Sequence, residues 1–95
     1  MILEVATLFI KKGESQLFEA DFKIAIQFLC QISGYQSHSL QKCVEQDDKY
    51  ILLVNWNKLE DHTIGFRQSP QYLEWKKLLH HYFIPSPIVE HYEAI

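Results

Sequence analysis

The sequence predicts an α+β fold in which two helices cover one face of a four-stranded sheet. Segments with the apolar, β-branched character of strands begin and end the chain. Apolar residues recur every three or four positions after the first strand, as in an amphipathic helix. Two neighbouring strands and more helical pattern follow. The resulting order, β-α-β-β-α-β, favours a ferredoxin-like sandwich with both helices on the same face of the sheet.

The first half of the chain supplies one strand and one helix. Residues 2–11 form the strand, and Lys12-Gly13 ends it. The helical pattern then continues to Ser33-Gly34, where glycine suits the left-handed conformation that closes many helices. The apolar residues that define the helix are Phe18, Phe22, Ala25, Leu29 and Ile32.

A hairpin occupies the middle of the chain. Residues 36–45 form a polar strand, residues 46–48 a turn, and residues 49–55 an apolar strand. The apolar strand is hydrophobic on both faces because its side chains alternate. Tyr50, Leu52, Val54 and Trp56 point one way, whereas Ile51 and Leu53 point the other.

The second helical region contains two helix starts. Asn57 with Glu60 three residues later resembles a capping box. Ser69-Pro70 marks a second start, with serine as the cap and proline in the first turn. Pro85 prevents further helix, and residues 88–94 form the last strand.

Composition and charge indicate an ordinary globular protein. The chain has 95 residues, 47% of them hydrophobic, and a formal net charge of −3. We expect one domain over residues 1–95. Lysine and arginine form no basic stripe, so nucleic-acid binding is not expected. The first residues resemble neither a signal peptide nor a membrane span, so we expect a cytoplasmic protein with no membrane association.

Cysteine and histidine spacing argues against a metal site. Cys30 and Cys43 form no CxxC pair, and two reduced thiols are expected. His38, His80-His81 and His91 lack the spacing of metal ligands. We therefore predict no bound metal.

A second copy of the chain is expected to cover the outer face of the sheet. Five apolar side chains share this face if the strands pair as expected. They are Leu3, Val5, Phe9, Ile51 and Leu53. Because an exposed apolar sheet face invites aggregation, the sequence predicts a homodimer through this face.

Several short motifs, taken in order, resemble the antibiotic biosynthesis monooxygenase domain, a family of dimeric α+β barrels. They lie at residues 13–20, 33–35, 50–56, 62, 69–70 and 88–92. The resemblance implies a homodimer with its sheets face to face and a pocket between the sheet and the helices of each protomer. It also implies oxidation of a small aromatic or polyketide-like molecule with molecular oxygen, with no cofactor.

His62 is the candidate general base. It shares a helical stripe with Leu59 and Phe66 and so faces inward. Its ordinary pKa lies near neutrality, which suits proton removal from a phenol or an activated methylene. The alternative is a core histidine that is hydrogen-bonded to a carbonyl.

Aromatic residues and one arginine are the candidate substrate pocket. Trp56, Phe66, Tyr72 and Trp75 either line the pocket or belong to the core. Arg67 either anchors an anionic substrate group or is solvated or paired with a carboxylate.

The sequence departs from two patterns of the family. Leu52 stands where some quinone-forming members have an asparagine. Thr7, Phe66 and Lys76 stand where haem-degrading relatives have Asn, Trp and His, so haem degradation is disfavoured. Two non-enzymatic alternatives therefore stay open, a ligand-binding dimer and a dimerisation module of the same fold.

Overall fold

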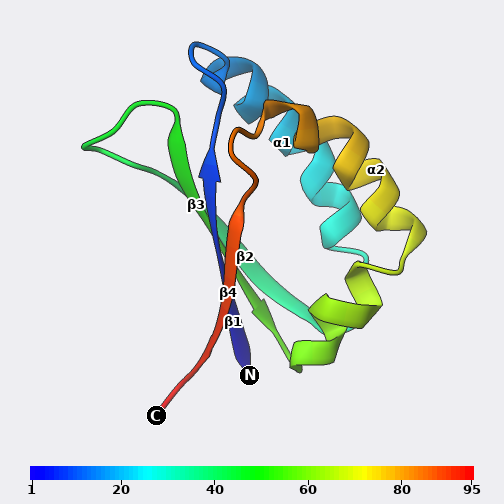
Figure 1. Cartoon of the computed structure of the whole chain (residues 1–95). Coiled ribbons are helices and arrows are strands. Elements are labelled where there is room, and N and C mark those ends of the chain that lie inside the picture. The colour runs from blue at the N-terminus through cyan, green and yellow to red at the C-terminus, as the bar shows by residue number, and fades with distance from the viewer.

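A computed structural model describes all of residues 1–95. Two helices lie on one face of a four-stranded sheet, in the order that the sequence predicts (Figure 1). The elements are β1 (Ile2–Phe9), α1 (Ser15–Leu29), β2 (Tyr35–Lys42), β3 (Lys49–Trp56), the π-helix η1 (Asp61–Phe66), α2 (Pro70–Leu79), the 3-10 turn η2 (His80–Tyr82) and β4 (Ile88–Glu93). No helix has the length and apolar character needed to cross a bilayer.

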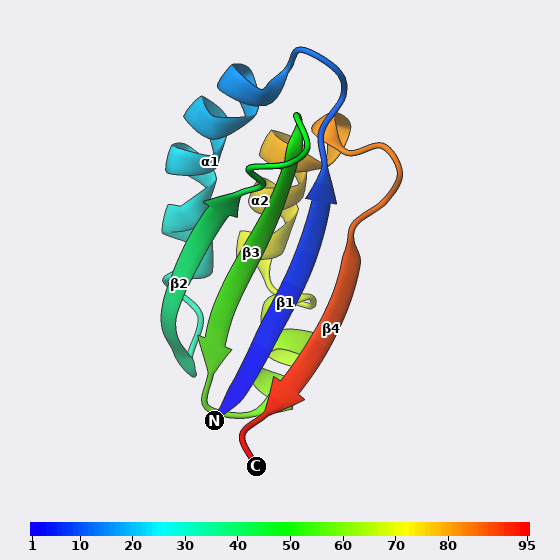
Figure 2. The same cartoon turned by 90° about the vertical axis from the view of Figure 1, so that its left-hand side faces the viewer.

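The strands lie in the order β2-β3-β1-β4, and every neighbouring pair is antiparallel (Figure 2). This is the order of a ferredoxin-like sheet, and it confirms the predicted fold class. The central strand β1 pairs with β3 on one side and with β4 on the other. Glu4 is therefore opposite Val54 on β3 and His91 on β4, which brings three distant parts of the sequence together.

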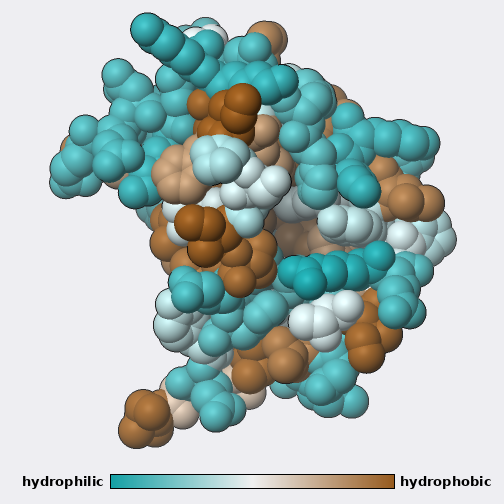
Figure 3. Space-filling view, viewed as in Figure 1, coloured by the Kyte–Doolittle hydropathy of each residue, from teal (hydrophilic) through white to brown (hydrophobic).

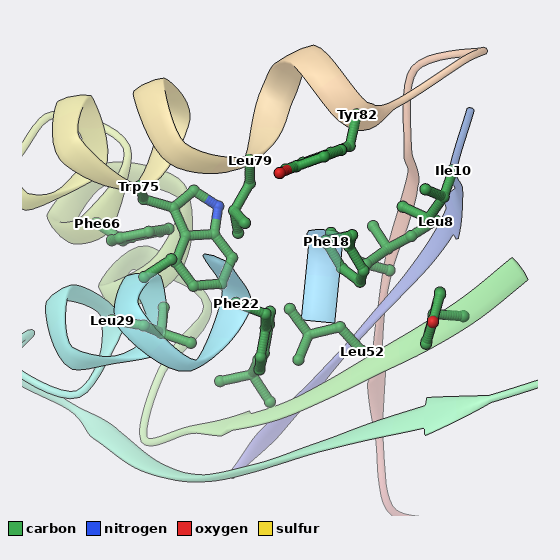
Figure 4. Close-up of a cluster of buried hydrophobic side chains, with 14 of the residues drawn as sticks. Leu8, Ile10, Phe18, Phe22, Leu29, Leu52, Phe66, Trp75, Leu79 and Tyr82 are labelled. Carbon is green, nitrogen blue, oxygen red and sulfur yellow. The ribbon is translucent and has the colours of Figure 1, made fainter. Parts of the chain in front are cut away.

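The hydrophobic core lies between the sheet and the two helices (Figure 4). Leu8 and Leu52 project from the sheet toward Phe18 of α1 and Leu79 of α2. The strand alternation holds as predicted, since Tyr50, Leu52, Val54 and Trp56 are all buried. Burial of these large side chains, each worth about 1.5–3 kcal/mol, fixes which face of the sheet the helices cover.

The opposite face of the sheet has no helix over it and faces the viewer in Figure 2. Its apolar side chains are only partly buried within the chain. They are Leu3, Val5, Phe9, Ile51 and Leu53. The register of β1 with β3 places Val5 opposite Leu53, at the centre of this apolar patch.

The predicted capping box after β3 is wrong. The Asn57 side chain accepts a hydrogen bond from Gln36 instead of capping a helix. Asp61 accepts the Lys58 backbone N–H at 3.0 Å and so closes the turn before η1. Gln36, at the bulge of β2, competes with the helix N-terminus for the Asn57 side chain. A local sequence pattern cannot show a contact of this kind.

The predicted end of α1 is three residues late, whereas the predicted start of α2 is confirmed. Helix α1 ends at Leu29, and Gly34 takes a φ of +92° in the turn that leads to β2. At the start of α2, Ser69 Oγ accepts the Tyr72 N–H at 3.1 Å, and Pro70 is the first helical residue.

Candidate functional site

A cavity of about 180 Å³ lies between the helix-facing side of the sheet and the helical layer formed by η1 and α2. Its lining is mostly hydrophobic, and Figure 3 shows a recess with apolar residues at its floor. The cavity brings together five residues that the sequence singled out. They are His62, Phe66, Arg67, Tyr72 and Trp75.

Aromatic rings form one wall of this cavity. Phe66 meets the edge of Tyr72 at 5.1 Å and that of Trp75 at 5.6 Å between ring centroids, both nearly perpendicular. Edge-to-face packing of this kind holds the rings in fixed orientations. The three rings thus form an apolar wall of the cavity.

The π-helix η1 directs His62 and Phe66 toward the sheet. The Arg67 N–H donates to the His62 carbonyl at 3.2 Å, the five-residue step of a π-helix. His62 and Phe66 are both buried, but Leu59 is 39% exposed. The predicted stripe of three is therefore wrong for Leu59, because it precedes η1.

Glu4 and His62 form a buried acid–base pair at the cavity. Glu4 is 6% exposed and His62 is 4% exposed. Glu4 Oε1 accepts the Trp56 indole N–H at 3.0 Å and lies 3.4 Å from His62 Nε2. Glu4 Oε2 accepts no hydrogen bond from the protein. It is not fully buried, because every fully buried side-chain oxygen has a hydrogen-bond partner. Glu4 itself lines the cavity.

Burial shifts the pKa of both groups toward the neutral form. It raises the pKa of Glu4 to about 7, although the Trp56 hydrogen bond and the Arg67 charge oppose the change. It lowers the pKa of His62 to about 3, with further lowering by Arg67 and His91. At neutral pH His62 is uncharged, and Glu4 is divided between acid and carboxylate.

His91 extends the pair toward the edge of the sheet. Its Nε2 lies 2.8 Å from His62 Nδ1, and its side chain is half-buried on the edge strand β4. Each ring nitrogen of His62 thus has a different partner, Glu4 on one side and His91 on the other. The three side chains form a chain and do not converge on one point, and no group in the structure is arranged to hold a metal ion.

Trp56 and Arg67 occupy different positions around the pair. Trp56 has no exposed surface, is not part of the cavity lining, and stacks on His62 at 5.4 Å between centroids. It orients Glu4 and His62 from behind the cavity wall. Arg67 lines the cavity but is exposed, and its charge acts on Glu4, His62 and His91.

Sequence reasoning missed Glu4 and His91 as members of the site. The signal for Glu4 is present, because it shares a strand face with Ala6 and Leu8, where an acidic residue is out of place. No local signal marks His91. Its position opposite Glu4 follows only from the pairing of β1 with β4.

Comparison with known proteins agrees with this architecture. The model of the antibiotic biosynthesis monooxygenase family matches residues 1–78. The chain belongs to this family. It is also 50% identical, over 100% of both chains, to the uncharacterized protein YczJ of Bacillus subtilis.

Solved structures of family members show the same fold. A protein from Bordetella bronchiseptica, described as a proposed antibiotic biosynthesis monooxygenase, has a TM-score of 0.95 and 30% identity, over 99% of this chain and 96% of that one. SnoaB, a cofactor-independent oxygenase from Streptomyces nogalater, has a TM-score of 0.83 and 16% identity, over 99% of this chain and 92% of that one. At that identity, the likeness to SnoaB concerns the fold alone.

Proposed function

We propose that this protein is a cofactor-independent monooxygenase that oxidises a small, electron-rich phenol with molecular oxygen. The observation that carries the proposal is the buried Glu4–His62 pair at an aromatic-walled cavity. An apolar cavity with few polar groups and perturbed pKa values is typical of a catalytic site. Membership of the monooxygenase family supports the reaction type.

The size of the cavity favours a substrate with a single ring. Its volume of about 180 Å³ is close to that of an engineered protein cavity of about 150 Å³ that binds benzene. A phenol with one or two small substituents fits this space. The walls formed by Phe66 and Trp75 would hold the ring, and Arg67 at the exposed side would pair with an anionic substituent.

Glu4 and His62 act in this proposal as one acid–base unit. Ionised Glu4 removes the substrate hydroxyl proton through Oε2, the oxygen that we place toward the cavity, while Oε1 contacts His62. A pKa of about 7 makes Glu4 a much stronger base than an exposed carboxylate. Glu4 thus takes, in this proposal, the role of base that the sequence suggested for His62, because a pKa of about 3 makes His62 a weak base.

The oxygenation balances without a cofactor. The phenolate gives one electron to O₂, and the resulting radicals combine to form a C–O–O bond at the ring carbon para to the hydroxyl. Loss of the C–H proton from this carbon breaks the O–O bond and leaves a carbonyl. The ring has then supplied four electrons, one oxygen atom is in the quinone, and the other leaves as water with the two hydrogens.

Two matched resorcinols test the proposal, one with a carboxylate substituent and one with a methyl group in its place. We expect one O₂ consumed per quinone formed, with one oxygen-18 atom in the product when the gas is labelled. Glu4→Gln and His62→Gln should each lower kcat by about 100-fold. Arg67→Gln should raise KM about tenfold for the carboxylate alone.

Residues outside the cavity provide the control variants. Glu74→Gln on α2 and His81→Gln on η2 remove the same chemical groups outside the cavity and should leave kcat unchanged. Oxygen uptake no greater than in buffer, across a panel of single-ring phenols, contradicts the catalytic proposal. Binding without turnover in calorimetry then assigns the cavity to a ligand-binding module.

We also propose that residues 1–95 act as one domain of a homodimer formed through the open sheet face. The apolar patch that includes Val5 and Leu53 supports this interface, because water contact with such a patch is unfavourable. We further propose a cytoplasmic location. Cys30 and Cys43 are both free thiols, which persist in reducing compartments.

A further inference from the structure

The Glu4 carboxyl needs a route for protons that does not pass through the cavity. Glu4 and His62 are nearly inaccessible from outside. A bound ring displaces water from the Glu4 oxygen that faces the cavity. Glu4 must nevertheless be ionised before each reaction cycle, and burial favours its neutral form.

The contact between His62 and His91 supplies such a route. His62 lies between Glu4 at 3.4 Å and His91 at 2.8 Å, each on a separate ring nitrogen. The 2.8 Å distance is that of a good hydrogen bond. His91 lies on β4, the edge strand, and is only half-buried.

We propose that His91 is the gate through which the buried Glu4–His62 pair exchanges protons with solvent. Its role in turnover depends on the proposed monooxygenase function, but the proton path itself does not. Nothing in the sequence pattern or in the comparisons assigns a role to His91. It is a positioning and relay residue, since it touches neither the cavity nor a substrate.

The proton leaves by a balanced shift along the three side chains. The proton taken up on Oε2 first comes to face His62 by rotation of the Glu4 carboxyl group. Protonated Glu4 then gives this proton to His62 Nε2, while the Nδ1 proton of His62 passes to His91 Nε2. The Nδ1 proton of His91 then passes to water. Both histidines begin and end neutral, so the path requires no imidazolium in the interior. The reverse shift returns the proton to Glu4.

The path ties the tautomer of His62 to the ionisation of Glu4. When Glu4 is protonated, His62 carries its proton on Nδ1 and donates to His91. When Glu4 is a carboxylate, His62 carries its proton on Nε2 and accepts from His91. Arg67 is the other charged group that acts on the pair.

Nitrogen-15 NMR of the ring nitrogens tests the path without any substrate. In the wild type we expect the His62 proton to move from Nδ1 to Nε2 as the pH rises through about 7, the pKa of Glu4. The tautomer switch should disappear in Glu4→Gln. His91→Gln keeps a polar side chain but relays protons poorly, and it should slow exchange of the His62 ring N–H with solvent at least about tenfold.

The catalytic readout is measured on the resorcinols described above. His91→Gln should lower kcat about tenfold, enlarge the solvent deuterium isotope effect, and leave KM unchanged. Added imidazole should restore part of the rate in His91→Ala, where it can occupy the vacated space. The control His81→Gln changes an exposed histidine outside the chain of contacts and should behave as the wild type.

The outcomes separate this proposal from the proposed function. Unchanged exchange of the His62 ring N–H with solvent in His91→Gln overturns the gate. A wild type that shows the switch and the slowed exchange in His91→Gln, but consumes no oxygen, refutes the monooxygenase and retains the gate. If His91→Ala does not fold, the exchange rate in His91→Gln decides.

Discussion

Glu4 is the residue on which the chemistry of the site depends. Burying a carboxyl group costs several kcal/mol unless it is neutral or hydrogen-bonded. The structure uses both means, since Trp56 donates to Glu4 and burial raises its pKa to about 7. The same burial that costs folding free energy also raises the pKa of Glu4, and it therefore makes the carboxylate a stronger base.

Glu4→Gln is predicted to change how the free energy of unfolding depends on pH. The folded pKa of Glu4, about 7, lies above its ordinary value of 4.5, so the folded state binds the proton more tightly. Ionisation therefore costs stability as the pH rises from about 4.5 to 7. Relative to Glu4→Gln, the wild type should lose about 2 kcal/mol between pH 5 and pH 8. Urea unfolding at both pH values measures this difference.

His62→Gln provides a control of opposite sign. The folded pKa of His62, about 3, lies below its ordinary value of 6.5, so the unfolded state binds the proton more tightly. Its contribution is present above pH 6.5 and is lost as the pH falls toward 3. Relative to His62→Gln, the wild type should lose stability on acidification. If the stability of both variants changes with pH as that of the wild type does, the two side chains are not buried as described.

At the scale of elements, the turns around η1 set the geometry of the site. Gly34 precedes β2 with a φ of +92°, and a Cβ there would lie 2.0 Å from the Asp61 carboxylate. Asp61 in turn holds the Lys58 N–H at the start of η1. A side chain at Gly34 would therefore displace the turn that carries His62.

Gly34→Ala is predicted to destabilise the protein more than Gly13→Ala. Gly13 also has a positive φ, +79°, but nothing lies within 4 Å of its missing Cβ. Gly13→Ala should thus show backbone strain alone, about 1 kcal/mol. Gly34→Ala combines strain with the clash against Asp61 and should cost about 3 kcal/mol. Thermal unfolding compares the two, and equal losses would rule out the contact with Asp61.

At the scale of the whole molecule, the two faces of the sheet have separate roles. The helix-facing side carries the core and the cavity. The other side carries the apolar patch on β1 and β3. A dimer through this patch would leave the cavity intact.

Charged substitutions on the open face are predicted to produce a monomer. Val5→Lys with Leu53→Lys places two positive charges opposite each other in the register. Light scattering at micromolar concentration should give the mass of two chains for the wild type and of one for the variant. Leu73→Lys on α2 alters a side chain that is already 59% exposed and should remain dimeric. A wild type with the mass of one chain contradicts the proposed interface.

The sequence by itself determined the elements, their order and the two faces of the sheet. These features depend on local signals, such as the alternation along β3 and the Ser69-Pro70 start of α2, which act over a few residues. Inward placement of His62 and Phe66 was also predictable, because the apolar spacing of a helix marks its buried side.

Only the tertiary structure decided the chemistry of the site. Glu4, His62 and His91 are brought together by the pairing of β1 with β4 and by the packing of η1 on the sheet. Their pKa values depend on burial, which belongs to the assembled molecule and to no segment of it. The Asn57 cap failed for the same reason, because a contact from β2 replaced the local hydrogen bond.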